Sequence, residues 1–192
     1  MPKLWSETVQ DHRSEVRDAV LDVTAELVAA EGLLAVSMSR IAEAAGIGRA
    51  TLYKYFPDAE SVLLAWHERQ VGRHLEELRA AREQAAGPGE ALQGVLTAYA
   101  RICQQAGAHH HAELATVLHR HAHAHGAQQQ LQALLRDVLV TARDAELLRT
   151  DASPEELLTY CQHALAGAAD LHDRESVGRL VELTISGLRP PR

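Results

Sequence analysis

The sequence contains only two cysteines, Cys103 and Cys161, among 192 residues. Two isolated cysteines exclude a disulfide framework and a zinc site built from cysteine thiolates. No stretch approaches the roughly 18 consecutive apolar residues that a membrane-spanning helix needs. The N-terminus has no apolar run of the kind that forms a signal peptide. We therefore expect a cytoplasmic protein that does not insert into a membrane.

An excess of positive charge is also missing, because the formal net charge is −7 with the histidines neutral. The first 60 residues hold six Lys or Arg and ten Asp or Glu, a local net charge of −4. Composition therefore gives no support for nucleic-acid binding. Any DNA-binding site must depend on the local placement of a few basic side chains.

Motifs for catalysis are absent as well. The chain has no Gly-x-Ser-x-Gly, no phosphate loop, no Gly-x-Gly-x-x-Gly and no Cys–His pair with an orienting partner. The carboxylate pairs Glu76-Glu77 and Glu155-Glu156 are typical of a solvated surface or a helix cap. We expect a protein that is not an enzyme and that has no cofactor and no assigned metal ligand.

Helical patterning extends over the whole chain, and 46% hydrophobic residues are enough to bury a core. Glycine and proline occur mainly where helices would end. The fold class is therefore all-α, with about nine helices in two domains, residues 1–57 and 58–192. The expected helices cover residues 7–30, 37–45, 49–56, 58–86, 90–106, a short helix between two loops within 109–125, 128–148, 154–171 and 176–188.

The most informative segment runs from Ser37 to Phe56 and contains two short helices joined by Gly46-Ile47-Gly48. Ser37 is an N-cap residue, and Gly46 suits the left-handed conformation that closes a helix. The inward positions are apolar or small: Ile41, Ala42 and Ala45 in the first helix, Leu52 and Phe56 in the second. Small residues allow the two helices to cross closely, which predicts a helix-turn-helix.

The outer face of the second helix is suited to DNA. Arg49 or Lys54 can reach guanine edges, and the Ala50 methyl group can contact a thymine methyl. The hydroxyl groups of this helix can donate to phosphate oxygens; they belong to Thr51, Tyr53 and Tyr55. The segment 37–56 carries a net charge of +2 and three of the seven aromatic residues of the chain. A helical hairpin with ordinary packing tyrosines is the alternative interpretation.

This segment resembles the DNA-binding domain of the TetR family of transcriptional regulators. The matching residues are Ser37, Ile41-Ala42, Ala45-Gly46, Ile47, Thr51-Leu52-Tyr53 and Tyr55-Phe56. The number of helices, the length of the chain and the N-terminal position of the motif also fit that family. Three positions depart from its pattern. Gly48 removes the usual capping serine, Ala50 replaces a glycine, and Ala59 replaces a lysine that often contacts phosphate.

The resemblance implies a regulator, usually a repressor, that binds a palindromic operator as a homodimer and is released by a small-molecule effector. The family's DNA contacts fall here on Ser37, Arg49, Ala50, Thr51, Tyr53, Lys54 and Tyr55, and this sequence adds Ser39 and Arg40 as phosphate candidates. Expected dimer contacts are Leu165, Ala168, Val177, Leu180, Val181, Thr184 and Leu188. A candidate effector pocket combines Trp66, Tyr99, Ile102, Cys103, Leu114, Val117, Leu118, Leu135, Leu139, Tyr160 and Cys161, each of which can equally be ordinary core.

A second hypothesis concerns the histidine-rich stretch from His109 to His125. The pairs His119/His123 and His121/His125 have the i, i+4 spacing that can chelate a transition metal on a helix. The two pairs point about 160° to 200° apart, so they cannot form one four-histidine site. The alternative function is therefore a metal-binding or metal-sensing protein, with a solvated histidine-rich surface or a pH response as simpler interpretations.

Overall fold

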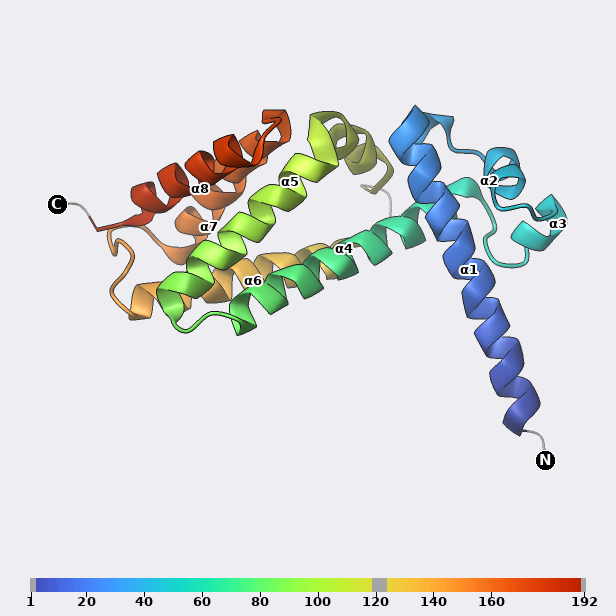
Figure 1. Ribbon diagram of the computed structural model, residues 1–192, viewed down its shortest axis with the longest axis horizontal. Helices are drawn as coiled ribbons and strands as arrows, with labels where there is room; N and C mark the ends of the chain where they lie inside the picture. Colours follow the sequence, from blue (N-terminus) through green and yellow to red (C-terminus); the bar gives the residue numbers. More distant parts are fainter. Residues whose placement is uncertain (1–2, 119–123, 191–192) are drawn as a thin grey trace. The chain divides into compact units, whose positions relative to one another are not determined.

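The computed structural model describes the backbone of residues 3–118 and 124–190 and the side chains of residues 13–105, 126 and 129–190. The described part is helical and contains no strand, as the all-α prediction requires (Figure 1). It comprises α1 (Lys3–Glu31), η1 (Leu33–Ala35), α2 (Met38–Ala44), α3 (Arg49–Leu52), α4 (Ala59–Glu83), α5 (Pro88–Leu118), α6 (Ala124–Asp144), α7 (Pro154–Ala166), η2 (Gly167–Asp170) and α8 (Arg174–Leu188). None of the described helices is both long and apolar enough to cross a membrane.

Two predicted helix boundaries are wrong. The predicted loop between residues 106 and 109 does not occur, because α5 continues from Pro88 to Leu118. A single glycine, Gly107, costs a helix only about 1 kcal/mol relative to alanine, and its neighbours are mostly good helix formers. The helix predicted to reach residue 171 changes at Gly167 into the tighter 3-10 turns of η2.

Helix starts were easier to predict because their capping side chains are local. Ser153 and Glu156 form a capping box at α7: the Ser153 Oγ accepts from the Glu156 N–H, and a Glu156 carboxylate oxygen accepts from the Ser153 N–H at 2.6 Å. This hydrogen bond lowers the pKa of Glu156. A lowered pKa means that the cap stabilises the folded chain at neutral pH and loses this effect as the pH falls through the carboxyl's titration range.

Replacing Ser153 with alanine is expected to reduce the free energy of unfolding by about 1 kcal/mol, because the N-terminus of α7 loses its side-chain acceptor. Urea denaturation followed by circular dichroism measures the effect. The matched control is Ser186→Ala in the last turn of α8, which should change stability by less than about 0.5 kcal/mol. Equal losses in both variants would contradict a role for the cap.

The chain folds into two compact units, each with its own hydrophobic core. The N-terminal unit extends through α4 as far as Arg69 and also includes the end of α5. Its core contains Val62, Leu63, Ala65 and Trp66 from α4, packed with residues of α1, η1, α2 and α3. The first turns of α4 thus complete this core, and the unit extends beyond the predicted boundary at residue 57.

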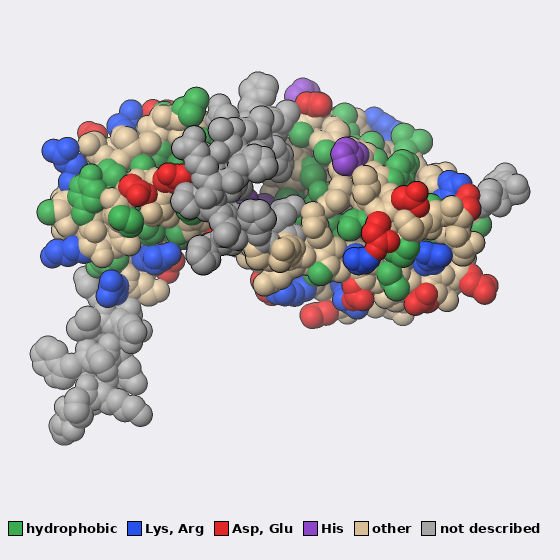
Figure 2. Space-filling model, turned by 180° about the vertical axis from the view of Figure 1, so that it is seen from behind, with side chains coloured by type: hydrophobic (Ala, Val, Ile, Leu, Met, Phe, Trp, Pro, Cys, Tyr) green, Lys and Arg blue, Asp and Glu red, His purple; other side chains and the backbone are tan. Residues whose placement is uncertain are grey.

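The C-terminal unit contains the rest of α4 together with α5, α6, α7 and α8. Gly94 allows α5 to approach α4, since a Cβ atom there would lie 3.3 Å from the Ala81 carbonyl oxygen. Arg82 of α4 forms an ion pair with Asp137 of α6 at 2.6 Å. Figure 2 shows acidic and basic side chains interspersed over this unit, with hydrophobic side chains exposed between them.

The residues predicted as dimer contacts lie mostly inside this core. Leu180 is half-buried, but the other six are at most 2% exposed: Leu165, Ala168, Val177, Val181, Thr184 and Leu188. Their side chains are therefore used for packing within one chain, which corrects their assignment to a subunit interface. An apolar stripe on a helix indicates that the face is buried but not whether the same chain or a second chain buries it.

The predicted effector pocket is divided between the two units. Six of its residues belong to the C-terminal core: Tyr99, Ile102, Cys103, Leu135, Leu139 and Cys161. Trp66 instead belongs to the N-terminal core, and Tyr160 is 44% exposed on α7. The side chains of Leu114, Val117 and Leu118 lie outside the described residues. Of the predicted set, only the six core residues are brought together.

Candidate nucleic-acid interface

The predicted helix-turn-helix is formed by α2, a three-residue turn and α3, which lie beside α1 (Figure 1). Ser37 caps α2, with its Oγ accepting from the Arg40 N–H. Gly46 has φ 65°, a left-handed conformation that glycine adopts without a Cβ penalty. The following Ile47 N–H donates to the Ala42 carbonyl at 3.0 Å and closes α2. The local chemistry of Ser37 and Gly46 thus sets where α2 starts and ends.

The second helix is shorter than predicted, because α3 ends at Leu52 rather than at Phe56. The chain continues in tight turns, in which the Tyr55 N–H donates to the Leu52 carbonyl at 3.0 Å. Pro57 disfavours the helical conformation of the residue before it, which accounts for the early end. Gly48 provides no side-chain cap at the start of α3, as its sequence position predicted. Leu52 and Phe56 are buried as expected.

All nine predicted DNA-contact residues belong to the N-terminal unit. Those exposed to solvent are Ser37, Ser39, Arg40, Arg49, Ala50, Tyr53 and Lys54. Thr51 and Tyr55 are half-buried, while Tyr53 is the most open of the tyrosines of this segment, at 54% exposure. The structure thus presents basic and hydroxyl-bearing side chains together on α2, α3 and the turn that follows. Which of them contact DNA remains a prediction.

Two of the basic candidates have partners within the unit. Arg40 forms an ion pair with Glu31, the last residue of α1. Arg49 donates a hydrogen bond from its guanidinium to the Ser39 Oγ at 3.4 Å, which connects α3 to α2. Both contacts are exposed, and exposed pairs of this kind typically stabilise a protein by less than about 1 kcal/mol. Phosphate binding by Arg40 must therefore compete with Glu31.

Replacing Glu31 with glutamine is expected to strengthen binding of a DNA duplex by about twofold to fivefold at low salt, because Arg40 no longer has a carboxylate competitor. Fluorescence anisotropy with a labelled duplex measures the change. Glu26→Gln, an exposed position on the same helix, is the matched control for the loss of one negative charge. Equal gains from both variants would show that only net charge matters.

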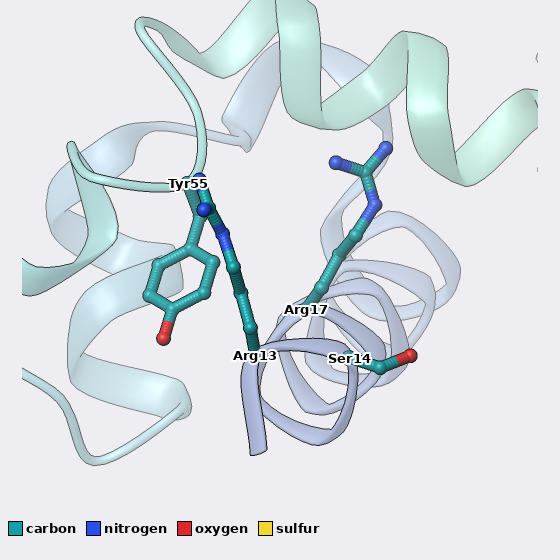
Figure 3. Close-up of a pocket in the computed structure, with 4 residues that line it drawn as sticks. All are labelled: Arg13, Ser14, Arg17 and Tyr55. Carbon is teal, nitrogen blue, oxygen red and sulfur yellow. The ribbon is translucent and has the colours of Figure 1, made fainter. Parts of the chain in front are cut away.

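Two arginines that the sequence analysis did not consider form a hollow beside this surface (Figure 3). A cavity of about 260 Å³ is lined by Arg13, Ser14 and Arg17 of α1 and by Tyr55. The Arg13 guanidinium carbon lies 5.9 Å from the centre of the Tyr55 ring, and that of Arg17 lies 4.8 Å from the centre of the Phe56 ring. These distances are typical of cation–π contacts. We call these four lining residues the Arg13–Arg17 pocket.

A sequence signal for the pocket exists. Val20, Thr24 and Val28 form the buried stripe of α1 at helical spacing. Continued toward the N-terminus by one and two turns, the same stripe reaches Arg17 and Arg13. A basic side chain at such a position must extend along the edge of the core rather than into solvent alone. An interruption of an apolar stripe by two arginines four residues apart therefore marks this surface.

The acidic residues of α1 lie on another side of the helix. Glu15, Asp18 and Asp22 project about 140° to 200° away from Arg13 around the helix axis. Arg69 of α4 donates to the Asp22 carboxylate at 2.7 Å and to the Asp18 carbonyl at 3.2 Å. The surface that carries Arg13 and Arg17 is thus separated from these carboxylates, two of which interact with Arg69.

The histidine-rich stretch that motivates the metal hypothesis lies outside the described side chains. Among the side chains that the structure describes, no group of three or more His, Cys, Asp or Glu residues is placed to hold a metal ion. The metal hypothesis therefore gains no support from the described part of the chain.

Comparison with known proteins matches residues 20–66 to bacterial regulatory proteins of the tetR family. The matched region covers the described part of the N-terminal core from Val20 to Trp66. The chain is also 32% identical over 96 residues to the HTH-type transcriptional regulator BetI of Rhizobium meliloti, an alignment that covers 50% of this chain and 44% of that protein. The match thus spans less than half the length of that relative.

Solved structures resemble the chain over nearly its whole length. TetR transcriptional regulator SCO0520 of Streptomyces coelicolor is 27% identical, with a TM-score of 0.63 over 92% of this chain and 99% of that one. Transcriptional regulator FadR of Bacillus subtilis, solved with stearoyl-CoA, is 17% identical, with a TM-score of 0.71 over 89% of this chain and 98% of that one. The second likeness concerns the fold alone.

Proposed function

The chain carries the DNA-binding domain of the TetR family at residues 20–66 and the helical fold of that family's regulators, and on this premise we propose that it is a ligand-responsive transcriptional repressor. It binds a palindromic operator as a homodimer, with one helix-turn-helix reading each half-site. An effector bound in the C-terminal unit releases it from the operator. The effector must bind the released state more tightly than the DNA-bound state to produce this response.

The observation that carries this proposal is the exposed surface of α2, α3 and the following turn. The apolar side chains Ile41, Leu52 and Phe56 are buried, while Arg49, Tyr53 and Lys54 are exposed. A recognition helix needs this division, because base edges are read by side chains that project away from the supporting core. The acidic composition of the whole chain does not oppose it, since the basic side chains are gathered locally.

The outward faces of α7 and α8 support the homodimer. Tyr160 of α7 and Leu183 of α8 are 44% and 69% exposed. A Cβ atom at Gly187 would lie 2.5 Å from the Tyr160 hydroxyl oxygen, so Tyr160 covers Gly187, which lies one turn after Leu183. Exposed apolar side chains therefore share one surface across two adjacent helices. Two such helix pairs can meet around a two-fold axis as a four-helix bundle.

The core around Tyr99 supports an apolar effector. Burial raises the pKa of Tyr99, which also hydrogen bonds with Cys103, and burial raises the pKa of Cys161 to about 12. These shifts show that the surroundings disfavour charge. An effector that enters here would be mostly apolar and would exchange hydrogen bonds with the neutral Tyr99 hydroxyl. The stearoyl-CoA complex of FadR shows that a protein of this fold can bind a ligand with a long apolar chain.

Selection of random double-stranded DNA by the purified protein, with sequencing of the bound pool, tests the proposal. We expect enrichment of a palindrome, because a symmetric dimer presents two identical recognition surfaces. The enriched duplex then serves as the probe for effector screening, in which an apolar compound should release it. A bound pool without sequence preference, from protein freed of copurified ligands by denaturation and refolding, would contradict the proposal.

A further inference from the structure

The Arg13–Arg17 pocket has the composition of an anion site. Its four lining residues provide two guanidinium groups and two hydroxyl groups, and none of them is a carboxylate. Guanidinium groups bind phosphate through paired N–H donors, and serine and tyrosine hydroxyls donate to phosphate oxygens. The volume of about 260 Å³ is ample for a single phosphate group.

The two guanidinium groups are held close to each other in the absence of a bound anion. Arg13 and Arg17 are one turn apart on α1, and like charges at this spacing repel each other by a few tenths of a kcal/mol. Their contacts with the consecutive rings of Tyr55 and Phe56 offset this repulsion and fix both side chains along the core edge. In Figure 3 both arginine side chains extend from α1 in the same general direction, with Arg13 alongside the Tyr55 ring.

The position of the pocket identifies the source of the phosphate. Tyr55 directly follows Tyr53 and Lys54, which are exposed at the end of the recognition segment. A recognition helix in the major groove, a groove about 12 Å wide, is bordered by phosphate backbones. The backbone that borders this end of the segment is the one that the Arg13–Arg17 pocket can reach.

We propose that the Arg13–Arg17 pocket binds a phosphate of the DNA backbone beside the groove that α3 reads. This inference rests on the proposed function, since it requires that the helix-turn-helix engages a duplex. The contact adds sequence-independent affinity and fixes the orientation of α3, because phosphate contacts set the register of a protein on the duplex. It also provides a basic contact where Ala59 occupies the position of the lysine that is often present in related regulators.

The salt dependence of DNA binding tests the contact, because each neutralised phosphate contributes about 0.9 to the slope of log affinity against log salt. The double variant Arg13→Gln, Arg17→Gln should lower this slope by about 1.8. If the two proteins bind equally at 1 M salt, its affinity at 0.1 M salt should be about 60-fold weaker. Fluorescence anisotropy is measured with the selected duplex and with a scrambled duplex, since a phosphate contact acts on both.

Two further variants separate a phosphate contact from other causes. Arg73→Gln, Arg101→Gln removes the same charge from exposed positions on α4 and α5 and should leave the slope unchanged. Arg13→Lys, Arg17→Lys retains the charge and should retain most of the slope. If the double glutamine variant does not fold, as judged by circular dichroism, the single variant Arg13→Gln replaces it, with an expected loss of about 0.9 in slope.

The outcomes distinguish this proposal from the proposed function. Wild-type protein that binds no duplex would overturn both. Wild-type protein that binds DNA with the same slope as a folded glutamine variant would overturn the phosphate contact alone and leave the regulator intact. An unchanged slope together with saturable binding of inorganic phosphate that depends on Arg13 and Arg17 would assign the pocket to a free phosphate compound and overturn the DNA contact.

Discussion

Replacing Arg49 and Lys54 together with alanine is expected to reduce the preference for the selected operator over a scrambled duplex by between about 30-fold and 10,000-fold. Each side chain that reads a base edge contributes about 1–3 kcal/mol of discrimination, and two are removed. Both residues are exposed, and the only contact printed by the geometry of either side chain that would be lost is the 3.4 Å hydrogen bond from Arg49 to Ser39. The fold should therefore be retained.

Anisotropy titrations of the two duplexes at one salt concentration measure this preference. The control variant Arg73→Ala, Arg101→Ala removes two exposed arginines from the C-terminal unit and should leave the ratio of the two affinities unchanged. Retained discrimination in the Arg49 and Lys54 variant would show that other residues of the recognition segment read the bases.

Replacing Leu183 with arginine is expected to convert the homodimer to monomers and to weaken binding of the palindromic duplex by at least about 100-fold. Leu183 is 69% exposed on α8, so a charged side chain there is solvated in the monomer but would be buried in the proposed interface. Affinity falls because two linked half-site contacts become independent, and linkage typically contributes 10²-fold to 10⁴-fold. Sedimentation equilibrium and anisotropy measure the two effects.

Leu147→Arg is the matched control, since Leu147 is also an exposed leucine of the C-terminal unit, at 42% exposure, but lies after α6 rather than on α8. It should leave both the dimer and DNA binding intact. A Leu183→Arg variant that stays dimeric would show that the exposed face of α8 does not form the interface.

The parts of the structure that could be predicted from the sequence are those set by neighbouring residues. Ser37 and Gly46 bound α2 through capping and a left-handed turn, and both features follow from residue type. Ile41, Leu52 and Phe56 were expected to be buried because they lie on the inward faces of two short helices, and they are buried. Short-range chemistry was sufficient for the helix-turn-helix.

The features that could not be predicted depend on what a helix packs against. The stripe containing Val177, Val181 and Leu188 indicates a buried face, but a subunit core and a dimer interface require the same stripe. Trp66 was placed with the pocket residues, although α4 contributes it to the N-terminal core. The use of Arg13 depends on its contact with Tyr55, 42 positions along the chain, which no local pattern contains.

The membership of the first turns of α4 in the N-terminal core determines how this protein can be recombined with others. A hybrid regulator joined at residue 57 would take its recognition segment from one parent and Val62, Leu63 and Trp66 from the other. Those three side chains would then have to fit a foreign set of partners, and mismatched core volumes cost about 1–3 kcal/mol each. A junction after Arg69 transfers these residues, and the ion pair of Arg69 with Asp22, as one piece. Exchange of operator specificity between such proteins should therefore succeed at the later junction.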